Sequence, residues 1–222
     1  MLSNMKQCTI SNVTINGAFP KSNGNCAMNI HCNGMVTIKD VTFTEKACAG
    51  TRYNGIEIGL SDKTEVPSII NIDNVRFEGS LLNNGILVFG TQDNAVINIR
   101  NCYFKKLSNA LRFSNHSNAK NVTVNIIDCV VDEWDKNDYA GLIICEDYTS
   151  KSKEEGQSNN LYAPEKLIIN ITNLTHAGKK LTKPEDISTI LGSGNDQILY
   201  VYGDKEGLVA YDRSRYPTVN IF

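Results

Sequence analysis

A six-residue segment recurs along the chain, and this recurrence constrains the fold more than any other feature. Each copy begins with Ile, has Asn or Asp at its third position and an apolar residue at its fourth. The copies lie at residues 10–15, 38–43, 72–77, 99–104, 126–131 and 171–176. Their third positions are Asn12, Asp40, Asn74, Asn101, Asp128 and Asn173, at spacings of 28, 34, 27, 27 and 45 residues.

A second repeat lies between the copies of the first. Its copies lie at residues 26–30, 54–58, 84–88, 109–113 and 140–144. Each contains a small residue, and these residues are Ala27, Gly55, Gly85, Ala110 and Gly141. Because both repeats advance by a similar step, we expect each turn of the chain to contribute one strand to each of two sheets. A β-sandwich, with strands every 8 to 12 residues, does not predict identical residues at so long a step.

The residues within each copy are typical of β-strands. Apolar residues alternate, as in Ile70 and Ile72 or Ile97 and Ile99, so one face of each strand is expected to point inward. No long window up to Leu174 has the apolar spacing of a helix. Asn and Asp tolerate a left-handed backbone and bond to nearby main chain, so the third position predicts a turn with a stack of polar side chains. We expect the small residues of the second repeat to allow a sharp corner.

This pattern resembles the right-handed parallel β-helix superfamily, which includes pectate lyases, polygalacturonases and phage tailspikes. The resemblance covers about residues 7–180 and implies an all-β solenoid of about five or six coils. It carries over no catalytic residue, because the Asn-Thr-Asp, Asp-Asp, Gly-His-Gly and Arg-Ile-Lys motifs of polygalacturonases are absent. Fold alone does not imply activity.

Departures from the repeat predict loops and a distinct C-terminal segment. Insertions are expected at residues 44–53, 60–68 and 146–164. From Leu181 the repeat stops, although residues 197–202 and 217–222 have strand-like sequences. We therefore divide the chain into a β-helix at 1–180 and a C-terminal cap or intersubunit contact at 181–222, because the ends of a solenoid expose unpaired strand edges.

Charge and cysteine content exclude several classes of protein. Twenty-two basic and 24 acidic side chains give a net charge of −2, which does not favour nucleic acid or an anionic membrane as a partner. No signal peptide is visible after Met1, and no apolar run is long enough to span a membrane. The seven cysteines form no CxxC pair, so we expect neither disulfides nor a zinc site, and interpret them as small core residues.

One acidic cluster is the best candidate for catalysis. Asp132, Glu133, Asp135 and Asp138 surround Trp134, the single tryptophan. The ring can stack on a sugar, and the carboxylates can act as acid and base or bind Ca²⁺. The alternative is a solvated turn with Trp134 packed on the neighbouring coil. Asp40 and Asp128 are interpreted as structural members of the polar stack, and no metal or cofactor site is predicted from the spacing of the histidines.

A candidate glycan-binding stripe lies on outward strand positions. Arg76, Tyr103 and Arg112 are expected to occupy consecutive coils and to form either this stripe or an ordinary solvated face. Trp134 of the acidic cluster is a further candidate for glycan binding.

These observations favour a non-catalytic structural or assembly protein. The resemblance to a superfamily that includes phage tailspikes implies a bacteriophage virion component, such as a capsid decoration or tail-associated subunit, assembled in the host cytoplasm. Its partners would be other protein subunits, in a homo-oligomer or larger assembly. The alternative is a carbohydrate-active lyase or hydrolase, or a glycan-binding protein, with polysaccharide as its ligand. A secreted adhesin would require an export signal.

Overall fold

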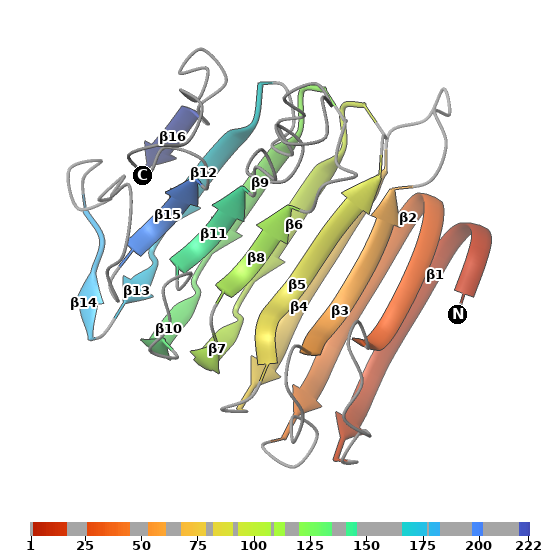
Figure 1. The fold of residues 1–222 in the computed structure, drawn as a ribbon, viewed down its shortest axis with the longest axis horizontal. Helices are drawn as coiled ribbons and strands as arrows, with labels where there is room; N and C mark the ends of the chain where they lie inside the picture. The colour runs from red at the N-terminus through yellow and green to blue at the C-terminus, as the bar shows by residue number, and fades with distance from the viewer. Residues whose placement is uncertain are drawn as a thin grey trace, which may run out of the picture.

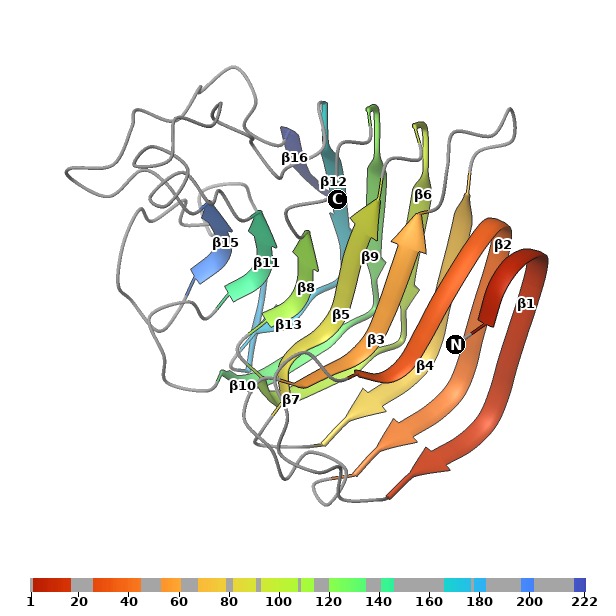
Figure 2. The ribbon, with the colours of Figure 1, turned by 45° about the vertical axis from the view of Figure 1, so that its right-hand side comes forward.

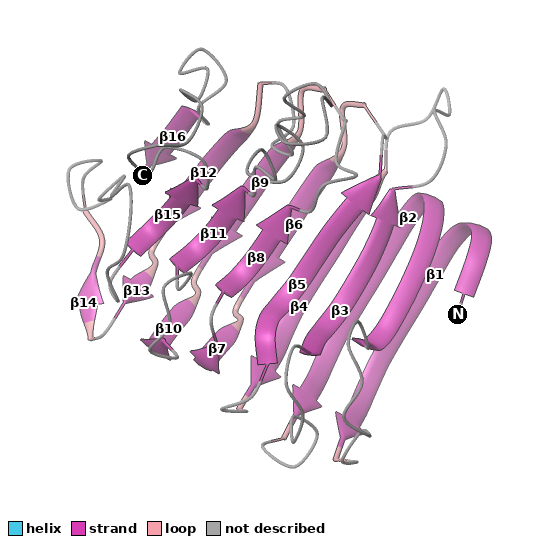
Figure 3. Ribbon diagram, in the orientation of Figure 1, coloured by secondary structure: helices cyan, strands magenta, loops and turns pink. Residues whose placement is uncertain are grey.

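The computed structural model describes residues 2–16, 26–44, 53–60, 68–78, 82–90, 93–107, 109–113, 120–134, 141–145, 166–176, 178–182, 197–201 and 218–222. Within these ranges the chain is all-β, with sixteen strands and no helix (Figure 3). No helix in the described residues is therefore long and apolar enough to cross a membrane. The strands are β1 (Leu2–Ile15), β2 (Cys26–Phe43), β3 (Tyr53–Leu60), β4 (Ile69–Phe77), β5 (Leu82–Gly90), β6 (Val96–Arg100), β7 (Tyr103–Leu107), β8 (Asn109–Phe113), β9 (Thr123–Ile127), β10 (Val130–Trp134), β11 (Gly141–Cys145), β12 (Ile168–Thr172), β13 (Thr175–His176), β14 (Lys179–Lys180), β15 (Gln197–Val201) and β16 (Thr218–Ile221).

The strands pair in parallel along three ladders. Ladder A consists of β1, β2, β4, β6, β9, β12 and β16. Ladder B uses the second halves of β1, β2 and β4, followed by β7, β10 and β13. Ladder C consists of the first half of β2, then β3, β5, β8, β11 and β15. Among the described strands only β13 and β14 pair antiparallel.

The chain visits the three ladders in a fixed order. After β6 in ladder A come β7 in ladder B and β8 in ladder C, and β9, β10 and β11 repeat this order one layer further along. Figures 1 and 2 show these layers advancing from β1 at one end to β15 and β16 at the other. The long strands β2 and β4 join the ladders into one sheet. Among the described residues this sheet does not close on itself.

The core lies between the ladders and is built from matching apolar side chains. Ile38, Ile72 and Ile99 follow one another in register in ladder A, and each is at most 1% exposed. In ladder B, the rings of Phe43 and Phe77 stack with centroids 4.8 Å apart, and those of Phe77 and Phe104 are 5.3 Å apart. Each such pair contributes about 0.5–1.5 kcal/mol beyond its buried area. Ile15 precedes Phe43 in the same register.

The register of the first repeat is confirmed, whereas that of the second is wrong in one layer. Residues 10, 38, 72, 99, 126 and 171 are successive partners in ladder A. In ladder C the sequence pattern aligned Gly141 with Ala110, but Gly141 pairs with Asn109 and Ile143 with Leu111. A slip by one residue exchanges the two faces of a strand, so Ile143 rather than Leu142 is in register with Leu111.

The second repeat requires small residues for a different physical reason from the sharp corner that was expected. Gly55 and Gly85 are buried in the strands β3 and β5, and their backbones do not have the positive φ of a sharp glycine corner. A Cβ added to Gly55 would lie 2.6 Å from Cε1 of Phe77 and 2.8 Å from the carbonyl oxygen of Gly85. The position is small because the aromatic stack and the next layer leave no room for a side chain.

Beyond Leu181 the chain adds further strands to the same ladders. β15 pairs in parallel with β11, and β16 pairs in parallel with β12. The strand-like sequences expected at residues 197–202 and 217–222 thus form strands at 197–201 and 218–221. The short β14 lies against the edge of ladder B (Figure 1). Most of each predicted insertion, at 45–52, 61–67 and 146–164, lies outside the described residues.

Candidate functional site

The exposed face of ladder B brings together two of the three residues of the predicted stripe. Arg76 of β4 and Tyr103 of β7 are partners in adjacent layers, and the Arg76 guanidinium lies 4.4 Å from the centroid of the Tyr103 ring. The Tyr103 hydroxyl donates to Oδ2 of Asp132, in β10 of the following layer, at 2.9 Å. On its other side, Nε of Arg76 donates to Oε1 of Glu78 at 3.0 Å. These four residues form a connected polar row over three layers.

The electrostatics of this row hold Tyr103 in its neutral form. Partial desolvation and the hydrogen bond to the Asp132 carboxylate raise the pKa of Tyr103, and the nearby Arg76 charge opposes this only in part. A neutral phenol donates to the carboxylate at physiological pH. The Arg76 cation lies over the Tyr103 ring, and the Asp132 carboxylate accepts the Tyr103 hydrogen bond. These contacts hold three layers together and place an aromatic ring and charged groups at the surface.

The other predicted site residues do not join this row in the described part of the chain. Arg112 lies in β8 of ladder C, where it pairs with Leu87 and Ile144. The prediction that Arg112 belongs to the same stripe as Arg76 and Tyr103 is therefore wrong. Glu133 and Trp134 belong to β10, but their side chains lie outside what the structure describes. Asp135 and Asp138 lie outside the described residues altogether. Among the described residues no group of His, Cys, Asp or Glu is arranged to hold a metal ion.

The six predicted stack positions share a left-handed backbone. Their φ angles are 58° for Asn12, 55° for Asp40, 52° for Asn74, 53° for Asn101, 53° for Asp128 and 53° for Asn173. Each therefore makes the turn between a strand of ladder A and a strand of ladder B. Asn and Asp are the residues other than glycine that most readily adopt this conformation.

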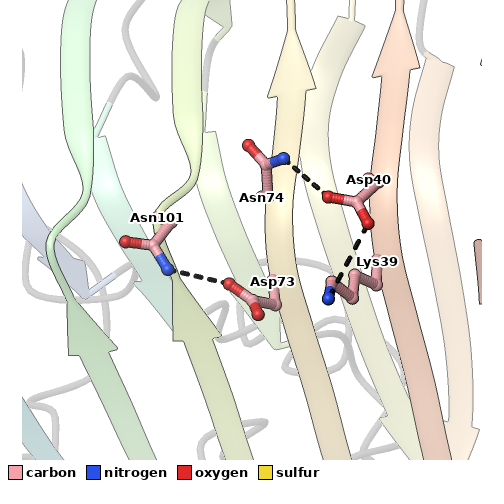
Figure 4. A network of polar contacts seen from close by, with 5 residues as sticks. All are labelled: Lys39, Asp40, Asp73, Asn74 and Asn101. Atoms are coloured by element: carbon pink, nitrogen blue, oxygen red, sulfur yellow. Dashed lines mark hydrogen bonds and ion pairs between the residues drawn. The ribbon is translucent and has the colours of Figure 1, made fainter. Parts of the chain in front are cut away.

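These turn positions do not form the single stack of polar side chains that the sequence suggested. Asn101 is exposed, and its Nδ2 donates to Oδ1 of Asp73 rather than to Asn74 (Figure 4). Asn74 donates to Asp40 at 2.7 Å, and Lys39 lies 3.9 Å from the same carboxylate (Figure 4). The side chains thus bond pairwise at the surface, and the backbone angle accounts for the choice of residue.

A longer stack, not recognised in the sequence, runs along the outer face of ladder A. We call it the outer amide file, and its members are Asn71, Asn98, Asn125, Asn170 and Asn220. Each Nδ2 donates to Oδ1 of the preceding member, at distances of 2.9, 2.8, 2.9 and 2.9 Å. The sequence signal was the residue between two isoleucines in 70–72 and 97–99, which was interpreted only as an outward position.

A second stack, the inner amide file, is buried beside ladder C. It consists of Asn54, Asn84 and Asn109, which are 8%, 2% and 3% exposed. Asn109 donates to Asn84 at 2.9 Å and Asn84 donates to Asn54. Nδ2 of Asn54 in turn donates to the carboxylate of Glu57 at 2.9 Å. The file ends on a charged acceptor, which strengthens the hydrogen bonds it receives.

Cys26 and Cys102 do not have the features of nucleophiles. Cys8, Cys102 and Cys129 form no disulfide and are buried, which confirms that they are core residues. The Cys102 thiol donates to the carbonyl of Arg100, and burial raises its pKa. Burial and the neighbouring Glu57 raise the pKa of Cys26 to about 12. A thiol is reactive only as the thiolate, so Cys26 and Cys102 stay protonated and unreactive at neutral pH.

Comparison of the chain with protein-family models, with curated proteins and with solved structures finds no match.

Proposed function

We propose that the chain is a right-handed parallel β-helix of about five or six coils, and that it serves as a non-catalytic structural protein of a larger assembly. The order in which the chain visits ladders A, B and C, with register kept from layer to layer, supports the solenoid. Residues 181–222 would form its C-terminal cap or an intersubunit contact. The addition of β15 and β16 as end layers supports a role at that end of the molecule.

The outer amide file is the observation that carries the structural role. Its four hydrogen bonds connect five layers, from Asn71 to Asn220, in one direction. Amide side chains neither gain nor lose a proton near neutral pH, so they do not perform acid–base chemistry. Stacked in register, they fix the layers relative to one another and stiffen the molecule along its length.

We place this role in a bacteriophage virion, as a capsid decoration protein or a tail-associated subunit assembled in the host cytoplasm. The support is the resemblance of the repeat to a superfamily that includes phage tailspikes. Neither nucleic acid nor a membrane is proposed as a partner, because the net charge is −2.

The test is mass spectrometry of phage particles purified from the host that carries the gene, combined with an activity assay. The proposal predicts peptides of this chain in the particles at a fixed ratio to the major capsid protein. It also predicts no release of sugar from bacterial polysaccharides by the purified chain. Absence from every particle fraction, or turnover of a polysaccharide, would overturn it.

A second candidate function is glycan binding or cleavage at the row of Arg76, Tyr103 and Asp132. The observation that favours it is a tyrosine ring held between a cation and a carboxylate on an exposed strand face. In a glycan array this alternative predicts binding that is lost in Tyr103→Ala. Thr42→Ala is the matched control, because Thr42 has the same register one layer before Arg76. Equal binding by the two variants would argue against this site.

A further inference from the structure

The outermost strands of ladder A each have one edge that no described strand covers. In the part of the chain that the structure describes, β1 pairs only with β2, and β16 pairs only with β12. Figure 1 shows these two strands at opposite ends of the molecule. The free edge of a strand presents a row of backbone donors and acceptors on which another strand can pair.

The apolar core continues to both of these ends. Ile10 of β1 and Val219 and Ile221 of β16 are partly exposed, whereas their counterparts Ile38 and Ile72 in the interior layers are 0% exposed. Apolar surface that an additional layer would bury is therefore available at both ends, and its removal from water favours association.

The backbone directions at the two edges are complementary. In ladder A the residues in register with Thr218 donate to the layer before them, as Thr218 N–H does to the Leu167 carbonyl and Ile168 N–H to the Val122 carbonyl. Other residues donate to the layer after them, as Asp128 N–H does to the Thr172 carbonyl. Parallel strands alternate these directions, so Thr9 N–H in β1 points away from β2. The carbonyl of Val219 likewise points away from β12. One edge thus offers donors where the other offers acceptors.

The side-chain hydrogen bonds of the outer amide file run in one direction only. Within it every Nδ2 donates to the preceding layer, and the file ends at Asn220, whose Oδ1 receives no hydrogen bond from a described residue. At the other end of ladder A the same register position is occupied by Thr37 and then by the exposed Thr9. A threonine hydroxyl can donate a hydrogen bond to an amide oxygen.

We propose that two copies of this chain associate head to tail, with β1 of one copy pairing in parallel on β16 of the other. Thr9 would lie on Asn220, Cys8 on Val219 and Ile10 on Ile221, in the register that ladder A keeps throughout. The proposal rests on the structural role proposed above and names its partner as a second copy. Contacts of this heterologous kind repeat, and so produce open filaments or closed rings.

Ladder B does not take part in this contact. Its last parallel strand, β13, is covered by β14, whose residues Lys179 and Lys180 are exposed. Lysine on a short terminal strand disfavours further pairing. Strand β1 contains no acidic residue, so attraction between opposite charges does not drive the association. We therefore expect the assembly to persist at high salt.

The test is sedimentation velocity of the full chain over a range of concentrations, with two proline variants. Thr9→Pro removes an N–H that points away from β2 in ladder A. Thr14→Pro removes such an N–H in the part of β1 that belongs to ladder B. In the same register of ladder B, the N–H groups of Val130 and Thr175 also donate to the preceding layer. Neither N–H bonds to β2, so both variants are expected to keep the wild-type far-UV circular dichroism. Wild type and Thr14→Pro should form larger species as the concentration rises, and Thr9→Pro should remain monomeric.

A disulfide trap tests the same register without depending on proline. Thr9→Cys and Asn220→Cys chains, mixed and mildly oxidised, should give a cross-linked dimer that neither chain forms alone, because neighbouring strands bring Cα atoms to about 4.8 Å. A wild-type chain that stays monomeric, or oligomers that persist in Thr9→Pro without this cross-link, would overturn the head-to-tail contact. Either result leaves the structural role standing, whereas polysaccharide turnover removes that role whatever the oligomeric state.

Discussion

At the scale of single residues, backbone conformation decides the choice of Asn and Asp at the turns between ladders A and B. Asn101 is exposed, has φ of 53° and bonds to Asp73 at the surface. A β-branched or apolar side chain at such a φ costs about 1–2 kcal/mol, whereas glycine adopts it without steric cost. The conformational demand therefore exceeds the contribution of one exposed hydrogen bond.

The first prediction follows from that angle. Asn101→Leu should lower the free energy of unfolding by about 1–2 kcal/mol, and Asn101→Gly should lower it by clearly less. Urea unfolding followed by circular dichroism measures both. Equal destabilisation by leucine and glycine would show that the lost hydrogen bond, and not the φ angle, determines stability at this turn.

The inner amide file predicts a different response at a buried position. Asn84 both accepts from Asn109 and donates to Asn54, so Asn84→Leu removes two buried hydrogen bonds of the file. Each unsatisfied buried group costs about 1–3 kcal/mol. The variant should lose more stability in urea than Asn98→Leu in the outer amide file, whose members are partly exposed. The reverse order would contradict the burial assigned to the inner file.

At the scale of strands, β3 offers a matched pair of glycines. A Cβ at Gly55 would meet the Phe77 ring and the backbone of β5, whereas at Gly59 it would meet the His31 imidazole at 2.8 Å. A side chain on the surface of a ladder moves more easily than a stacked aromatic ring. Gly55→Ala should therefore cost about 1–3 kcal/mol and Gly59→Ala less, as measured by thermal unfolding. Equal costs would mean that the aromatic stack is loosely packed.

The row across β4, β7 and β10 predicts a pH dependence. Because the pKa of Tyr103 is raised in the folded chain, its contribution to stability is fully present below the ordinary tyrosine value of about 10. That contribution is lost as the pH rises through the folded pKa. Absorbance titration should show one tyrosine that ionises late in the wild type and is missing in Tyr103→Phe. In Asp132→Asn its pKa should fall. An unchanged titration in Asp132→Asn would contradict the role of that carboxylate.

The strands and their parallel order could be predicted from sequence because apolar alternation and the turn residues repeat together. The register of β11 could not, because Ala140 and Gly141 are both small and nothing local distinguishes which of them aligns with Asn109. The outer amide file was missed because an asparagine between two isoleucines has the pattern of any outward strand position. Arg112 was assigned to the stripe because outward positions of ladders B and C look alike in sequence.

At the scale of the whole molecule, the two amide files run along the axis on which the layers stack, and each amide after the first donates to the file member in the layer before it. The central claim is that sequence-distant asparagines lie directly over one another in the outer amide file. Nuclear Overhauser measurements between the side-chain amides of a ¹⁵N-labelled chain test it most directly. We predict cross-peaks linking Asn98 to Asn125 and Asn125 to Asn170. Their absence, in a folded chain with assigned amide resonances, would contradict the layered structure and the function built on it.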